Sequence, residues 1–150
     1  MSHTYCSNRI HVIFSTRDRI KSLSDELQPK LWAYLSGIAR NQGFELIVAG
    51  GAAEHVHMLL VLPPALPLAK AVQLLKGNSS KWMNETRAAG TKFAWQEGYG
   101  AFSVSASQTS SVVEYIKNQG VHHAKRSFEE EFLVILKRYG VQYDAAYVLG

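Results

Sequence analysis

Two histidines alternate with apolar residues in the segment Glu54-His55-Val56-His57-Met58. The β-branched and apolar residues from 55 to 62 predict a strand, and successive side chains of a strand point to opposite faces. His55 and His57 are therefore expected on one face, where two imidazoles can bind one divalent cation. Two half-buried structural histidines would show the same pattern, so the pair alone leaves both interpretations open.

Tyr115 and Gln119 form a second candidate pair. The sequence Ser111-Val112-Val113-Glu114 matches a capping box and predicts that a helix begins there. Residues four apart on a helix share a face, so the two side chains are expected side by side. A phenolic oxygen can act as a covalent nucleophile, and an amide oxygen can bind a hard cation. Because the chain has seven tyrosines, a partly exposed tyrosine on an amphipathic helix is the alternative.

Four predicted strands and four predicted helices must position these residues. After a strand at 10–14, an apolar stripe that follows Asp25 predicts a helix ending near Gly43. A strand at 44–49, a Gly50-Gly51 turn and the histidine strand at 55–62 come next. They are followed by a helix from Leu68, a strand at 99–106 and a turn at 107–110. The last two elements are helices that start at Ser111 and at Ser127, and the second of these reaches about Tyr139. This order matches the split βαβ, or ferredoxin-like, arrangement. We therefore predict an α+β fold with an antiparallel sheet, helices on one face and added C-terminal helices.

Composition is that of one globular domain spanning residues 1–150. The chain is 47% hydrophobic and 19% charged, which excludes a disordered or collagen-like protein. Its net charge of +4 permits a polyanionic partner without requiring one. A lone Cys6 excludes a disulfide scaffold and a thiolate metal cluster. Prolines interrupt the longest apolar run, so we expect a soluble cytoplasmic protein with no membrane partner.

Five short motifs follow one another along the chain. They are Ile10–Phe14 with the basic turn Ser15-Thr16-Arg17, Glu54-His55-Val56-His57-Met58-Leu59, Leu75-Lys76-Gly77-Asn78-Ser79-Ser80, Tyr115-Ile116-Lys117-Asn118-Gln119 with His122-His123, and Leu136-Lys137-Arg138-Tyr139-Gly140-Val141. Their order and spacing resemble those of the HUH-type single-tyrosine transposases of small insertion sequences, over nearly the whole chain. Each motif is weak alone, and the resemblance is specific through their combination. Glu54 stands where many members of that family have Asp.

The resemblance implies an activity, because members of this family cut and rejoin single-stranded DNA. Tyr115 would attack a backbone phosphate and leave a 5′-phosphotyrosine and a free 3′-hydroxyl, with no nucleotide cofactor. His55 and His57 would hold Mg²⁺ or Mn²⁺, with Gln119 as the third protein ligand. The implied partners are single-stranded DNA, with hairpins at the element ends, and a second copy of the chain. In the family, the tyrosine helix of one subunit can serve the histidine pair of the other.

Candidate DNA contacts come from the same motifs. They are Arg17, Lys76, Ser79, Ser80, Lys117, His122 and His123, and a solvated polar face is the alternative for each of them. Glu129-Glu130-Glu131 gives the last helix an acidic first turn, which is favourable helix design without any function. The family suggests instead that the tail at 111–150 folds against the site or the partner subunit. His11, on the first strand, is interpreted as structural.

Two other functions fit the same residues. One is a nucleic-acid-binding domain of this fold that does not cut, which has no need of Tyr115 or of the histidine pair. The other is a metal-dependent hydrolase that uses His55 and His57 to activate water. That enzyme would tolerate the loss of Tyr115.

Overall fold

A four-stranded antiparallel sheet lies at the centre of the computed structural model, which describes residues 3–87, 90–120 and 126–148. The strands are β1 (Arg9–Ser15), β2 (Glu45–Gly51), β3 (His55–Val61) and β4 (Gly100–Val104), in the spatial order β2-β3-β1-β4. Helix α1 (Leu27–Asn41) connects β1 to β2, and α2 (Leu68–Thr86) connects β3 to β4. This topology confirms the predicted ferredoxin-like fold.

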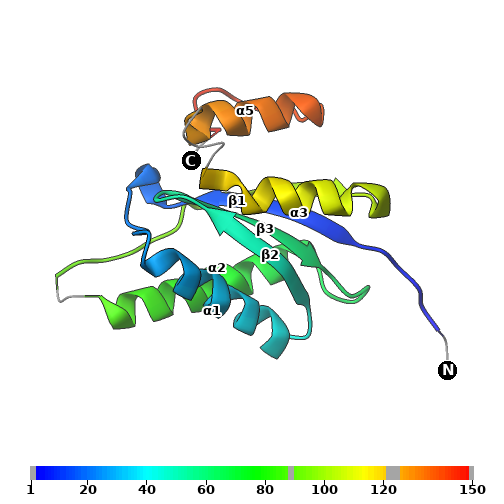
Figure 1. Ribbon diagram of the computed structural model, residues 1–150, viewed down its shortest axis with the longest axis horizontal. Helices are drawn as coiled ribbons and strands as arrows, with labels where there is room; N and C mark the ends of the chain where they lie inside the picture. Colours follow the sequence, from blue (N-terminus) through cyan, green and yellow to red (C-terminus); the bar gives the residue numbers. More distant parts are fainter. Residues whose placement is uncertain (1–2, 88–89, 121–125, 149–150) are drawn as a thin grey trace.

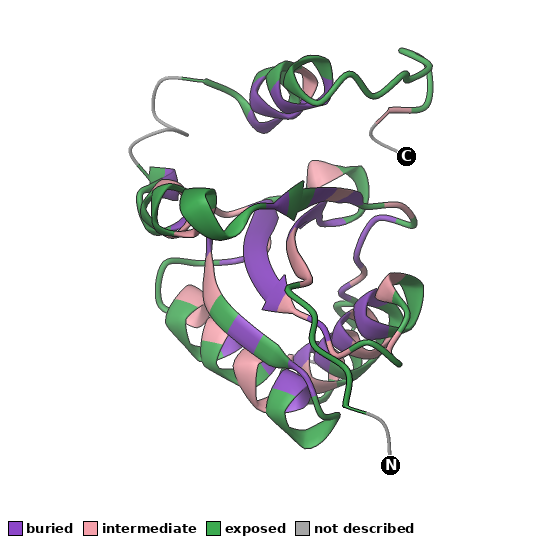
Figure 2. Ribbon diagram, turned by 90° about the vertical axis from the view of Figure 1, so that its right-hand side faces the viewer, coloured by how far each residue is buried: buried purple, intermediate pink, exposed green. Residues whose placement is uncertain are grey.

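Helices cover both faces of the sheet (Figure 1). Helices α1 and α2 lie on one face, and α3 (Thr109–Lys117) and α5 (Phe128–Arg138) lie on the opposite face. The pleat of β1 explains this division, because Val12 and Phe14 join the core under α1 and α2 while Ile13 packs with α5. The central strands β1 and β3 are consequently buried between two helical layers (Figure 2).

The predicted Gly50-Gly51 turn is wrong, because both glycines belong to β2 and pair with β3. Their role is to allow close approach of other backbone segments. A Cβ atom on Gly50 would lie 2.1 Å from the carbonyl oxygen of Ile116 in α3, and one on Gly51 would lie 2.1 Å from that of His55. Glycine at position 50 therefore lets the sheet and α3 touch at the level of their backbones.

The capping box predicted at Ser111 does not mark the start of its helix. Helix α3 starts at Thr109, two residues before Ser111, and no side chain caps it. The predicted turn at 107–110 is instead the short 3-10 helix η2 (Ala106–Gln108). Helix α5 confirms the predicted helix start at Ser127, whose hydroxyl caps the helix by accepting a hydrogen bond from the Glu130 amide. Among the described residues, no helix combines the length and apolar content that crossing a membrane requires.

Candidate active site

Three histidines from the two central strands meet on the sheet face that α3 and α5 cover. His55 and His57 extend from β3 on the same face, as predicted, and both are completely buried. His11 comes from the neighbouring strand β1 and is 4% exposed. Its Nε2 lies 2.9 Å from Nδ1 of His57. This hydrogen bond leaves the other ring nitrogen of His57, Nε2, to face the helices.

His55 is held from three sides. Its Nδ1 lies 2.6 Å from Oε1 of Glu54, and its Nε2 lies 3.1 Å from Oε1 of Gln119, just beyond the end of α3. The ring of Phe128 in α5 stacks on the imidazole at a centroid distance of 4.5 Å. A carboxylate bonded to Nδ1 fixes the ring orientation in the way that supports metal-binding histidines. The structure therefore brings the predicted ligands His55 and Gln119 together.

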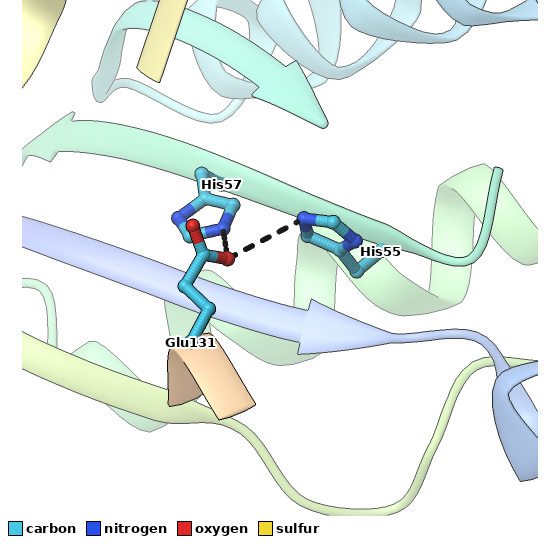
Figure 3. A group of neighbouring side chains, drawn as sticks. All are labelled: His55, His57 and Glu131. Atoms are coloured by element: carbon cyan, nitrogen blue, oxygen red, sulfur yellow. Dashed lines mark hydrogen bonds and ion pairs between the residues drawn. The ribbon is translucent and has the colours of Figure 1, made fainter. Parts of the chain in front are cut away.

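Glu131 of α5 lies between the histidines and the tyrosine. Its Oε1 lies 3.0 Å from Nε2 of His57 and 3.8 Å from Nε2 of His55. Figure 3 shows the carboxylate reaching from α5 toward both imidazoles. The Tyr115 hydroxyl donates a short hydrogen bond to the other carboxylate oxygen, Oε2. One carboxylate thus joins the predicted nucleophile to the histidine pair.

Burial, hydrogen bonds and neighbouring charges together set the charge states of these groups. Burial tends to raise the pKa of Glu131, but hydrogen bonds and charges from His57, Tyr115 and His55 outweigh it and lower the pKa to about 2. Burial raises the pKa of the Tyr115 hydroxyl, and the bond and charge of Glu131 raise it further. Burial and the charge of His57 lower the pKa of His11 to about 3. The resting site therefore holds a carboxylate, a protonated phenol and a neutral His11.

The donor atoms of this cluster fit a divalent cation. His55, His57 and Glu131 each offer one ligand atom, and these atoms lie within 4.8 Å of one another. Gln119 adds an amide oxygen next to His55. Two imidazole nitrogens with oxygen donors suit Mn²⁺ among the abundant divalent ions, whereas Mg²⁺ prefers oxygen ligands alone.

Glu131 was not among the predicted site residues, because its position indicated only an acidic first turn of the last helix. A usable signal was present in the spacing of α5. Glu131 lies three residues after Phe128 and four before Ile135, on the helix stripe that is otherwise apolar and buried. An acidic side chain on a buried stripe needs a polar partner, and here the partners are His57 and Tyr115.

The predicted DNA contacts lie in different surroundings. Arg17 is exposed in the short 3-10 helix η1 (Arg17–Arg19), and Lys117 is exposed at the end of α3. Lys76 donates three hydrogen bonds to the backbone carbonyls of residues 96–98, at 2.6 to 3.1 Å. Ser79 is buried and bonds to the Leu75 carbonyl and to the Trp95 indole. Ser80 is partly exposed on α2, and His122 and His123 lie outside the described residues.

Comparison with known proteins identifies the family. Residues 4–119 match the family described as "Transposase IS200 like". The chain is 26% identical over 125 residues to the transposase for insertion sequence element IS200 of Salmonella typhimurium LT2, covering 79% of this chain and 81% of that protein. A solved structure from Deinococcus radiodurans R1, described as a transposase, has a TM-score of 0.61 at 27% identity and covers 79% of this chain and 96% of its own.

A second solved structure shares the fold at lower identity. It is a REP-associated tyrosine transposase bound to a REP hairpin, with a TM-score of 0.61 and 18% identity, covering 82% of this chain and 73% of its own. The family match spans His55, His57, Tyr115 and Gln119, and it ends before Glu131 and α5. Because the matched residues make up well over half of the sequence, this chain belongs to the IS200-like transposases.

Proposed function

We propose that this protein cuts and rejoins single-stranded DNA by transesterification at Tyr115. The observation that supports the proposal is the meeting of the half-buried Tyr115 with the buried Glu131 and His57 in one hydrogen-bonded cluster. The Salmonella relative is a transposase for an insertion sequence, and the solved tyrosine transposase is bound to a hairpin. Both facts favour single-stranded DNA with hairpins at the ends of a mobile element as the partner.

His55, His57 and Glu131, with Gln119 beside them, would hold a divalent metal ion, Mn²⁺ or Mg²⁺. When bound, such an ion polarises a phosphate and offsets the negative charge that develops during attack. Glu54 and His11 keep the two imidazoles oriented through the Nδ1 atoms. The ring nitrogens that face Glu131 and Gln119 are then those available to the metal.

The reaction at Tyr115 is a balanced exchange of phosphate ester bonds. The phenolic oxygen forms a bond to phosphorus while the bond to the 3′ oxygen breaks, leaving a 5′-phosphotyrosine and a 3′-hydroxyl. The phenolic proton passes to Glu131, which already accepts its hydrogen bond, and the departing 3′ oxygen takes a proton from solvent. Attack by another 3′-hydroxyl reverses the step and joins two strands, so no nucleotide cofactor is needed.

A homodimer would bring two such sites to two DNA ends. One chain can make the contacts of Tyr115 and Gln119 with the cluster by itself, so each copy would carry a whole site. Sedimentation equilibrium at several protein concentrations tests the dimer. A monomer mass at all concentrations, with and without DNA, would contradict it.

The experiment that tests the cutting activity uses 3′-labelled single-stranded oligonucleotides covering both flanks of the gene, incubated with the protein and Mn²⁺. We expect a covalent protein–DNA band with the wild type and none with Tyr115→Phe. Tyr34→Phe is the matched control, because Tyr34 lies on α1 on the other face of the sheet. Cleavage that survives Tyr115→Phe would indicate a hydrolase. Binding without any cleavage would indicate a non-cutting nucleic-acid-binding domain.

A further inference from the structure

A pocket of about 610 Å³ opens onto Tyr115 from outside the histidine cluster. Its walls are the edge strand β4 with the residues that follow it, the first turns of α3, and one side of α5. His11, Tyr115 and Glu131 all contribute to its lining. The two metal-site histidines are completely buried, so the pocket is a route by which a ligand can reach the tyrosine.

Several other polar side chains of the lining make no hydrogen bond within the described part of the chain. Ser103, Gln108 and Ser111 are exposed, and within the described ranges their side chains have no hydrogen-bond partner. The same holds for the guanidinium groups of Arg126 and Arg138. Arg138 is close enough for its charge to lower the pKa of Tyr115. These donors favour a ligand that carries both negative charge and hydrogen-bond acceptors.

The remaining wall is apolar and partly aromatic. Val112 of α3 and Val134 of α5 line the pocket, with Tyr139 just beyond the end of α5. The Tyr139 ring packs against Phe102 with a centroid distance of 4.8 Å and remains 43% exposed. An exposed aromatic ring that is held in place by a second ring and lies beside polar donors is a suitable surface for stacking a nucleobase. The pocket volume lies in the range of sites for small molecules and cofactors.

We propose that this pocket binds the nucleotide adjoining the phosphate that Tyr115 attacks. The base occupies the space between Tyr139 and α3, where Gln108 and Ser111 meet its edge, and the arginines face the backbone phosphates. The pocket thus contributes to the choice of the sequence at the cut. This inference rests on the proposed function and adds a base-recognition site to it.

Two matched pairs of variants test the pocket. Ser111→Leu puts a larger side chain into the pocket. Ser110→Leu makes the same change at an exposed neighbouring residue that does not line the pocket. Arg138→Gln removes a lining charge, and Lys137→Gln removes the adjacent exposed charge outside it. All four are made in the Tyr115→Phe background, so that binding is measured without cutting. Thermal melts confirm that each variant is folded.

The assay is fluorescence anisotropy with the single-stranded flank oligonucleotides, intact or with one abasic nucleotide at each position in turn. We expect one position at which loss of the base weakens binding about tenfold, as for a stacked base. Ser111→Leu should weaken binding of the intact strand by a similar factor and abolish the abasic effect at that position. Arg138→Gln should reduce the salt dependence of binding, and the two control variants should behave like the parent.

Three results would overturn the proposal: equal losses in the test and control variants, an abasic effect that persists in Ser111→Leu, or no position that responds. Failure of the proposed function is a separate result. If the wild type forms no covalent adduct but the anisotropy pattern is as expected, the base pocket stands and the cutting activity does not.

Discussion

His11 offers a sharp test of how the histidine pair is organised. It is buried on β1, and its Nε2 lies 2.9 Å from Nδ1 of His57. Replacing it by phenylalanine keeps an aromatic ring of similar size but removes the hydrogen-bond partner. His57 is completely buried, so water cannot readily replace that partner. Such supporting groups typically change metal affinity by about 10- to 100-fold, or roughly 1.4 to 2.7 kcal/mol.

We therefore expect His11→Phe to raise the dissociation constant for Mn²⁺ by about 10- to 100-fold. The measurement is a titration followed by the electron paramagnetic resonance of free Mn²⁺, which does not depend on DNA cleavage. His11→Gln is the control, because its amide can accept or donate the same bond, and it should retain most of the affinity. Equal losses in His11→Phe and His11→Gln would refute the reasoning, as would a wild-type affinity in His11→Phe. A wild type that binds no Mn²⁺ would refute the metal site itself.

Three further predictions concern stability and DNA contacts. Folding lowers the pKa of Glu131 from 4.5 to about 2. The ionised carboxylate therefore stabilises the folded state at pH values above about 4.5, and this stabilisation is lost as the pH falls from about 4.5 to about 2. The stability difference between the wild type and Glu131→Gln, measured by chemical denaturation, should therefore shrink by up to about 3 kcal/mol between pH 6 and pH 2; a constant difference would contradict it. Gly50→Ala should destabilise the fold by about 1–3 kcal/mol, because its Cβ would overlap the Ile116 carbonyl. Gly37→Ala, with open space around its Cβ, should be neutral or stabilising in the same melts. Lys76→Met should lower the melting temperature and leave the salt slope of DNA binding unchanged, because its ammonium bonds backbone carbonyls; Lys117→Met should reduce that slope by about one.

The sequence was sufficient for the features that depend on local periodicity. The alternation around His55 and His57 predicted that both lie on one face of a strand, and the i to i+4 spacing of Tyr115 and Gln119 predicted that both lie on one face of a helix. The order of strands and helices was enough for the sheet topology, because a split βαβ unit has few ways to pair its strands.

The features that the sequence analysis missed depend on contacts between distant segments. Glu131 meets His57 across 74 positions of the chain, and no local pattern encodes where α5 packs. His11 was interpreted only as a structural residue of the first strand, and its hydrogen bond to His57 depends on the register of β1 and β3. Gly50-Gly51 resembles a turn in sequence, whereas its small size serves a contact with α3 that only the folded chain reveals.

The contact between Gly50 and Ile116 also bears on how two copies could share their active sites. Exchange of tyrosine helices between subunits requires each α3 to leave its own sheet and dock on the sheet of the other copy. Here α3 meets β2 at backbone distance through Gly50, and Ile116 is completely buried against Leu59 and Val104. A swapped helix would have to rebuild this close fit on the partner, since leaving it open would expose apolar surface. A methyl group at position 50 would therefore clash with α3 in either arrangement, whether the helix belongs to the same chain or to the other copy.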